Sequence, residues 1–325
     1  MNSMKVVCFS NYGGPQNLFE ELRAVPLANE DEVLVRILYS SVNAGDHHLL
    51  RGEPWFIRLM FGWPKPKINV PGCDFVGRVE NAGSRISTFK QGDLVFGDLT
   101  SSKFGGFSQY TCAKLDALIK VPEGLSLQDA AVLPSAGVTA LQSLRLGGIE
   151  AGMKVLIHGA SGGVGSFAVQ IAKAYGAHVT AVCSTQKMAA VAKLGADELI
   201  DYRTCDFASQ NATYDLIHAV NGNLPLSHYR KALSSTGTYV MSGGGNRQLF
   251  EVIFKGAMLS RKQGQSFKSC MVQPNNEDLN LLAKWVIEGK LKPLISKEFE
   301  LSKAHEAMAY LEGRQGVGKI LINCS

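Results

Sequence analysis

A glycine-rich turn between an apolar strand and a long helix carries the clearest chemical signal in the sequence. In VLIHGASGGVGSFAVQIAKAYGAHVTAV, the positions of G-x-G-x-x-G are held by Ala160, Gly162 and Gly165, with alanine in place of the first glycine. Gly162 lets the backbone approach a pyrophosphate, and Gly165 lets the helix pack closely on the strand. The turn predicts a dinucleotide site with contacts at Ser161, Gly162, Gly163 and Val164, against the alternative of a glycine-rich turn that binds nothing.

The residues after the next strand indicate which dinucleotide binds. An NAD site usually places an acidic residue about 20 residues further on, where it accepts a hydrogen bond from the ribose 2′-hydroxyl. Residues 182–187 read VCSTQK and contain no carboxylate. Ser184 and Lys187 could instead bind a 2′-phosphate, because hydroxyl groups and a point charge suit that group. The sequence therefore predicts NADP(H), although a solvated lysine at a helix start would also explain Lys187.

Alternating strands and helices must hold these residues in place. Apolar runs of strand length are KVLIHG, HVTAVC, ELIDY, YDLIHAV and GTYVMSG, which begin at positions 154, 178, 198, 214 and 237. Helices are expected at residues 164–175 and 187–194. Short buried strands that alternate with helices predict an α/β fold with a Rossmann-type, doubly wound parallel sheet.

The remaining segments differ in texture. The first hundred residues read as short strands between glycine and proline turns, for example at residues 33–38, and predict a mostly-β module. Ser126 and Asp129 have the spacing of a capping box, which indicates a helix start. Beyond residue 260 the regularity fades, but helices are expected at residues 278–287 and 304–311, before a terminal strand KILIN.

Composition excludes several classes of function. The chain has 325 residues, 46% hydrophobic and 19% charged, which is enough for two globular domains. Its net charge of +5 is dispersed without a basic run, so neither nucleic acid nor a membrane surface is an expected partner. The seven cysteines are widely spaced, and no signal peptide or spanning helix is recognisable. A cytoplasmic location is therefore expected.

Several segments, taken in order, resemble the medium-chain dehydrogenase/reductase superfamily over essentially the whole chain. They are YGGP (residues 12–15), SVNAGDHHLLRG (41–52), PGCDFVGRV (71–79), LPSAGVTAL (133–141), GASGGVG (159–165) and GKILI (318–322). VNG (220–222) and LSRKQ (259–263) are similar to the quinone oxidoreductase and enone reductase branch. The resemblance implies a GroES-like catalytic domain from residues 1–123 and 261–325. A Rossmann domain would comprise residues 124–260, with NADP(H) in the crevice between the two.

The resemblance also bears on metal binding. The positions that hold catalytic zinc in the alcohol dehydrogenases of the superfamily carry Asn43, Cys73 and Ser135 in this chain. Asparagine and serine are poor zinc ligands, and one thiol cannot replace a tetrahedral set. The lobe of four clustered cysteines is absent as well, since residues 92–110 contain none. No metal is therefore expected, and Cys73 reads more simply as a small core residue.

The same resemblance proposes catalytic residues. Asn43 could bond the nicotinamide ribose or the acceptor oxygen, and Asp46 matches an aspartate of the family or merely orients a loop. His48 stands where many quinone oxidoreductases carry a tyrosine, so it is a candidate proton donor or simply a surface histidine. Four aromatic residues could stack on a flat acceptor or serve only in packing; they are Trp55, Phe56, Phe61 and Trp63.

Further cofactor contacts follow by position. Tyr202 matches a tyrosine beside the phosphate in quinone oxidoreductases, and other contacts are expected at Thr139, Asn221, Ser242 and Gly243. The resemblance implies a homodimer formed through the edges of the parallel sheets, with the run GTYVMSGG and residues 249–259 as candidate contacts.

The resemblance implies a zinc-free reductase. It would transfer hydride from NADPH to a quinone or to an α,β-unsaturated ketone or aldehyde. Two alternatives stay open at this point: a zinc-independent alcohol dehydrogenase, and a non-catalytic NADP(H)-binding protein of crystallin type.

Overall fold

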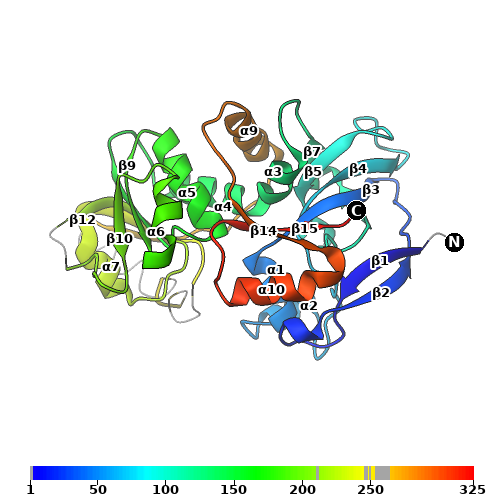
Figure 1. Cartoon of the computed structure of the whole chain (residues 1–325), viewed down its shortest axis with the longest axis horizontal. Coiled ribbons are helices and arrows are strands. Elements are labelled where there is room, and N and C mark those ends of the chain that lie inside the picture. The colour runs from blue at the N-terminus through cyan, green and yellow to red at the C-terminus, as the bar shows by residue number, and fades with distance from the viewer. Residues whose placement is uncertain (1–2, 210–211, 245–247, 249, 253–263) are drawn as a thin grey trace. The chain divides into compact units, whose positions relative to one another are not determined.

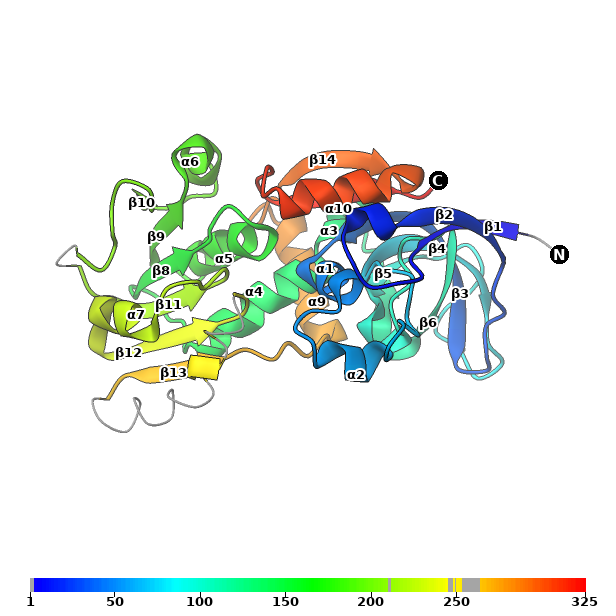
Figure 2. The same cartoon turned by 90° about the horizontal axis from the view of Figure 1, so that it is seen from below.

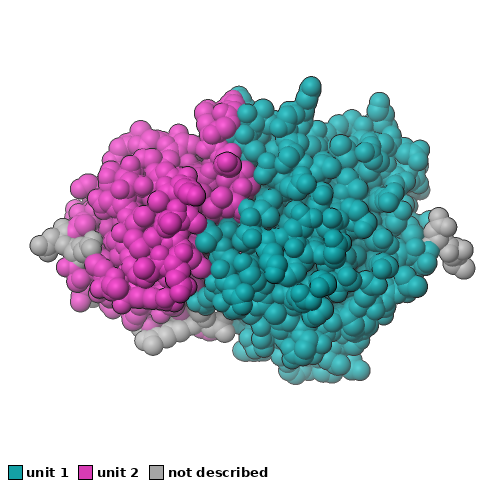
Figure 3. Space-filling view, viewed as in Figure 1, with its two compact units in different colours: residues 1–135, 274–287, 295–325 teal, residues 136–273, 288–294 magenta. Residues whose placement is uncertain are grey.

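The chain is divided into two compact units. The computed structural model describes residues 3–209, 212–244, 248, 250–252 and 264–325. Unit 1 comprises residues 1–135, 274–287 and 295–325, and unit 2 comprises residues 136–273 and 288–294 (Figure 3). The domain boundaries expected from the sequence, after residues 123 and 260, both fall earlier in the chain than the unit boundaries after residues 135 and 273.

Unit 2 is built on a six-stranded sheet in which every neighbouring pair is parallel (Figure 2). Its strands are β8 (Lys154–His158), β9 (His178–Cys183), β10 (Glu198–Asp201), β11 (Tyr214–Ala219), β12 (Leu233–Met241) and β13 (Ser266–Ser269). Their order is β10-β9-β8-β11-β12-β13, so that β9 and β10 lie on one side of β8, and β11, β12 and β13 lie on the other. This is the doubly wound sheet that the alternating pattern predicts.

Helices connect these strands and bury their apolar faces on the sheet. They are α4 (Pro134–Leu146), α5 (Gly163–Ala174), α6 (Thr185–Ala192) and α7 (Leu226–Ala232). Helix α5 packs on β8 and β9, α6 packs on β9 and β10, and α7 packs on β12. The core between them includes Leu156, Ile217, Tyr229 and Tyr239, all of which are buried. Residues on the strand ends are therefore held by a packed layer of helices.

Unit 1 is mostly β, also as predicted. A seven-stranded sheet has the order β14-β15-β3-β4-β5-β7, and β6 pairs with β3; a separate hairpin joins β1 to β2. The strands are β1 (Ser3–Cys8), β2 (Phe19–Ala24), β3 (Glu32–Val42), β4 (Asp74–Ala82), β5 (Leu94–Asp98), β6 (Tyr110–Lys114), β7 (Leu118–Lys120), β14 (Ile295–Glu300) and β15 (Lys319–Asn323). The helices are α1 (Ala44–Arg51), α2 (Ile57–Phe61), α3 (Leu127–Val132), α9 (Asn276–Ile287) and α10 (Ala304–Glu312) (Figure 1).

The terminal strand, β15, belongs to the seven-stranded sheet of unit 1. Strand β15 pairs with β3 in the antiparallel direction, with Ile320 opposite Val42 and Asn323 opposite Tyr39. Because of this register, Lys319 at the start of β15 lies beside the end of β3, where α1 begins. The expected strand KILIN is therefore present, and it brings a lysine next to Asn43.

The two segments expected to form dimer contacts lie at different places in unit 2. The run GTYVMSGG does not lie at the edge of the parallel sheet, because β13 pairs with β12 along Thr238–Met241. That expectation is wrong, and the edge on this side is β13. Of the other candidate contact, residues 249–259, only 250–252 are among the residues that the structure describes, and the motif at residues 259–263 lies outside them.

Candidate cofactor and catalytic site

The glycine turn follows β8 directly, as the fingerprint predicts. Gly162 caps α5 with an extended backbone (φ −78°, ψ 175°), and Ala160 is buried. A Cβ added to Gly165 would stand 2.1 Å from the carbonyl oxygen of Gly159, whereas one added to Gly162 would meet no atom closer than 3.6 Å. Gly165 is therefore required by packing of helix on strand, and Gly162 has room for a Cβ. Gly162 lies at a helix start, whose first amides are available to an anion.

Most of the other expected cofactor residues follow neighbouring strands of the same sheet. Ser184 follows β9, Tyr202 follows β10, Asn221 lies just beyond β11, and Ser242 and Gly243 follow β12. Carboxyl ends of parallel strands meet at one edge of a sheet, and ligands of doubly wound folds bind at that edge. The structure therefore brings these residues to the edge that carries the glycine turn. Thr139 lies instead on α4, where it is half-buried.

A buried histidine supports one of these residues. Nε2 of His218, in β11, lies 2.7 Å from Oγ of Ser242. Burial lowers the pKa of His218 to about 3. The same effect lowers the pKa of His158, which ends β8 and lies 2.7 Å from the Tyr229 hydroxyl, to about 4. Both imidazoles are therefore neutral near pH 7 and hold the strand ends by hydrogen bonds.

The expected phosphate site contains an acid that the sequence pattern did not reveal. Ser184 caps α6, Lys187 lies half-buried in the first turn of that helix, and Tyr202 is exposed. Asp201, at the end of β10, accepts hydrogen bonds from the Thr185 hydroxyl and from the Arg203 amide (3.0 Å). Chiefly because of the Thr185 bond, the pKa of Asp201 is lowered, so its carboxylate is ionised. Asp201 is therefore a carboxylate beside the residues expected to bind the 2′-phosphate, and it was not among the residues predicted from the sequence.

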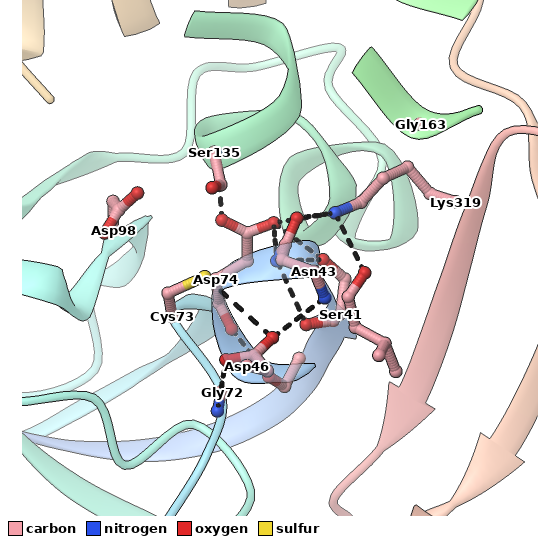
Figure 4. A network of polar contacts seen from close by, with 12 residues as sticks. Ser41, Asn43, Asp46, Gly72, Cys73, Asp74, Asp98, Ser135, Gly163 and Lys319 are labelled. Carbon is pink, nitrogen blue, oxygen red and sulfur yellow. Dashed lines mark hydrogen bonds and ion pairs between the residues drawn. The ribbon is translucent and has the colours of Figure 1, made fainter. Parts of the chain in front are cut away.

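In unit 1, a buried carboxylate organises a separate network of polar residues (Figure 4). Asp74, the first residue of β4, is completely buried. Its Oδ2 accepts hydrogen bonds from Ser41 Oγ (2.6 Å), Asn43 Nδ2 (2.9 Å) and Lys319 Nζ (3.1 Å), and its Oδ1 accepts one from the Ser135 amide (2.9 Å). A carboxylate has about four acceptor positions. Both oxygens of Asp74 are therefore hydrogen-bonded, and three of the four donors converge on Oδ2.

The amide of Asn43 is held from both ends. Its Oδ1 accepts a hydrogen bond from Lys319 Nζ, and its Nδ2 donates to Asp74 and to the Ser41 carbonyl oxygen (3.3 Å). A lysine ammonium can only donate and an ionised carboxylate can only accept, so the amide has one orientation. Asn43 cannot donate to an acceptor oxygen without giving up one of these bonds. A ligand that meets Asn43 here must donate to its Oδ1.

Asp46 has a supporting position. Its oxygens accept hydrogen bonds from the Asn43 and Gly72 amides, both 2.8 Å long, and the residue has no exposed surface. Burial raises the pKa of Asp46 to about 7. Burial, and secondarily the charge of Asp74, raise the pKa of Asp98 to about 6. Asp46 therefore fixes the start of α1 and the loop before β4 through backbone bonds, which was the alternative considered for it.

The possible metal ligands of this cluster also have partners within the protein. Ligand atoms of Cys73, Asp74 and Asp98 lie within 4.8 Å of one another. Burial raises the pKa of the Cys73 thiol well above its ordinary value. Asp74 already accepts the four hydrogen bonds described above, and Asp98 accepts two from Thr100. The positive charge in the cluster is the ammonium of Lys319.

The remaining candidates lie outside this network. His48 is exposed near the end of α1, and its Nδ1 donates to the Glu53 carbonyl oxygen (2.9 Å). Trp55 and Trp63 are more than 60% exposed, and Phe56 is half-buried. Phe61 packs edge-on against Phe104 in unit 1, with ring centroids 5.8 Å apart. Packing therefore explains Phe61, while the two tryptophans present free apolar surface.

Sequence reasoning missed Lys319, Asp74, Asp98 and Asp201 as site residues. A signal for Lys319 was present, because it opens a terminal strand that is otherwise apolar. A buried lysine needs a partner, and that requirement points to an acid elsewhere in the chain. Nothing in the local pattern identifies that acid as Asp74.

No helix among the described residues has the length and apolar character needed to cross a bilayer. Comparison with known proteins gives two family matches. Residues 29–123 match the alcohol dehydrogenase GroES-like domain, and residues 194–322 match the zinc-binding dehydrogenase family.

Relatives of similar length extend over nearly the whole chain. The chloroplast envelope quinone oxidoreductase homolog of Arabidopsis thaliana is 32% identical over 98% of both chains. The 2-methylene-furan-3-one reductase of Solanum lycopersicum is 32% identical over 99% of this chain and 79% of its own length. The solved structure of the quinone oxidoreductase from Coxiella burnetii superposes with a TM-score of 0.90, at 30% identity and 99% coverage of both chains.

Proposed function

The chain is an oxidoreductase of the medium-chain dehydrogenase/reductase superfamily, in its quinone oxidoreductase branch, and from this premise we propose a metal-independent NADPH reductase. Its acceptor would be a quinone or an α,β-unsaturated ketone or aldehyde. The observation that carries the proposal is the network around Asp74, in which an ammonium and three other donors bind the carboxylate where related enzymes hold a metal.

The acceptor class follows from this chemistry. Without a Lewis acid, oxidation of an unactivated alcohol is difficult, whereas an acceptor that is already polarised takes hydride readily. The nicotinamide cofactor supplies the hydride when it is bound. The protein then has to bind the cofactor, orient it and donate to the developing oxyanion.

Each task has a proposed residue. The turn at Gly162 would bind the pyrophosphate, and Ser184 with Lys187 would bind the 2′-phosphate. Asn43 would accept from a hydroxyl of the nicotinamide ribose, since its amide hydrogens are already used. His48 is the exposed candidate on α1. Its Nδ1 hydrogen already binds the Glu53 carbonyl oxygen, so Nε2 could donate to an acceptor only from the protonated imidazolium. Asp46 is too deeply buried to donate.

NADPH preference depends on a balance of charges. Lys187 and Arg203 favour a 2′-phosphate, and the carboxylate of Asp201 opposes it. Two hydrogen bonds already satisfy Asp201, and the Arg203 guanidinium lies 5.9 Å from the Tyr202 ring centroid on the same strand end. We therefore propose that the cations prevail.

A side-by-side turnover screen tests the function. Oxidation of NADPH is followed with quinones, short enals and cyclic enones, and the reverse reaction is followed with NADP⁺ and alcohols. Turnover with quinones or enones alone supports the proposal. Alcohol oxidation as the main activity would favour a zinc-independent dehydrogenase, and binding without turnover would favour a protein of crystallin type.

Two further expectations belong to this proposal. A homodimer would pair β13 with its copy, because β13 is an edge strand of the parallel sheet and an unpaired edge is a liability. Light scattering at micromolar concentration should give twice the chain mass, and a monomer mass would count against it. The cytoplasmic location expected from the sequence stays a prediction.

A further inference from the structure

A buried lysine, Lys319, belongs to the unit 1 network around Asp74 (Figure 4). We propose that Lys319 is a positioning residue: it clamps the Asn43 amide in the one orientation that presents Oδ1 to the nicotinamide ribose. The inference rests on the proposed function, because it requires Asn43 to meet the cofactor.

Lys319 cannot itself be a ligand-binding residue in this arrangement. Its side chain is 2% exposed, and its Nζ donates to Asp74 Oδ2 (3.1 Å), the Val42 carbonyl oxygen (3.4 Å) and Asn43 Oδ1. An ammonium has three N–H groups, and these three acceptors use all of them. Any effect of Lys319 on the cofactor must therefore pass through a neighbour, and Asn43 is the least buried of these polar side chains.

The clamp acts on both ends of the Asn43 amide. Rotating the amide by half a turn would put Nδ2 against the Lys319 ammonium and Oδ1 against the Asp74 carboxylate. Two hydrogen bonds would then become one donor–donor and one acceptor–acceptor contact, in a buried place where an unsatisfied group costs most. The ammonium and the carboxylate together therefore fix which atom of Asn43 meets a ligand.

The arrangement also explains why a charged side chain stands in a buried strand. Burying Lys319 is costly unless its charge is paired, and an apolar residue would extend the run ILI of β15 more simply. Asn43, Cys73 and Ser135, at the positions that resemble zinc ligands, all adjoin Asp74 or its donors. A covalently attached cation thus stands in this cluster, and it cannot be exchanged or removed by a chelator.

The test must separate the clamp from its contribution to stability. Lys319→Met alone leaves Asp74 buried without a cation, and that variant could fail to fold. The double variant Asp74→Asn/Lys319→Met removes both charges and keeps the side-chain volumes similar. Lys297→Met, an exposed lysine on the neighbouring strand β14, is the matched control. Circular dichroism and thermal unfolding confirm that each protein is folded.

Two probes report on different halves of the cofactor site. NADPH contains the nicotinamide ribose, and adenosine 2′,5′-bisphosphate lacks it. Calorimetric titration of the folded double variant should give a Kd for NADPH about tenfold weaker, the loss of about 1.4 kcal/mol. The Kd for the bisphosphate should stay within about twofold of the wild-type value. Lys297→Met should change neither.

Two results would overturn the clamp: an unchanged Kd for NADPH in the folded double variant, or an equal loss for both probes. Asn43→Ala tells whether a failure lies in the clamp or in the proposed function. If Asn43→Ala weakens NADPH binding while the double variant does not, the clamp is wrong. If Asn43→Ala also leaves NADPH binding unchanged, the proposed contact of Asn43 with the cofactor is wrong, and the inference fails with it.

Discussion

Two glycines of the same turn, three residues apart, should respond oppositely to one added methyl group. In Gly165→Ala the new Cβ would stand 2.1 Å from the Gly159 carbonyl oxygen and 2.8 Å from the Ala160 Cα. Both neighbours are backbone atoms of the turn, so they cannot rotate away. In Gly162→Ala the nearest atom would be 3.6 Å away, which is an ordinary contact. The first change should therefore affect folding, and the second should affect only what binds.

The size of each effect follows from these distances. Overpacking a buried site typically costs about 1–3 kcal/mol, and for a domain of this size each 1 kcal/mol lowers Tm by about 2–4 °C. Gly165→Ala should therefore lower Tm by several degrees. Gly162 already has a negative φ that alanine adopts, so Gly162→Ala should change stability by less than about 1 kcal/mol. Its methyl group would occupy the space proposed for the pyrophosphate, and NADPH affinity should fall at least about tenfold.

Differential scanning calorimetry of the cofactor-free proteins measures the first quantity, and titration with NADPH measures the second. Wild-type affinity in Gly162→Ala would mean that the pyrophosphate does not approach this turn. An unchanged Tm in Gly165→Ala would refute the packing argument. The two variants are each other's control, because they carry the same substitution in the same turn.

Three other expectations concern charge. Lys187→Ala should remove most of a roughly ten- to thousandfold preference for NADPH over NADH in kcat/KM, mainly through KM. Lys193→Ala, which changes an exposed lysine at the end of the same helix, should leave this preference unchanged. Equal use of both cofactors by the wild type would refute the phosphate site. Because the folded pKa of His158 is about 4 against 6.5, unfolding takes up a proton below pH 6.5, and stability decreases as the pH is lowered. His158→Gln, which does not titrate, should lose about 2 kcal/mol less than wild type between pH 7 and pH 5 in urea unfolding, and parallel curves would contradict this. Elemental analysis should find zinc well below one equivalent and activity should survive a chelator; stoichiometric zinc at Cys73 would overturn the metal-independent mechanism.

Parts of this architecture are readable from sequence because they depend on local patterns. The strands HVTAVC and KILIN coincide with β9 and β15, and Ser126 caps α3 by accepting from the Asp129 amide. Strands β13 (SFKS) and β14 (ISKEFE) were not predicted, because half-exposed edge segments rich in polar residues lack a clear apolar period.

The candidate site was predicted only in part, for a related reason. The glycine turn and the strand ends are local features, whereas the bond between Lys319 and Asp74 joins residues 245 positions apart. Asp201 was overlooked because its place beside Thr185 results from the parallel pairing of β10 with β9, not from any motif. Side-chain contacts made across the sheet order have no signature in a single sequence.

Because β15 pairs with β3, the sheet of unit 1 can be completed only late in the synthesis of the chain. Asn43 and Asp74 leave the ribosome long before Lys319, so throughout synthesis the sheet of unit 1 lacks both a strand and the cation for a carboxylate that it will bury. A chain cut before Lys319 would retain every strand of the parallel sheet in unit 2 but leave Asp74 unpaired. Loss of Lys319 at this end of the chain would therefore disturb Asn43 and Asp74, which come from the N-terminal part of unit 1.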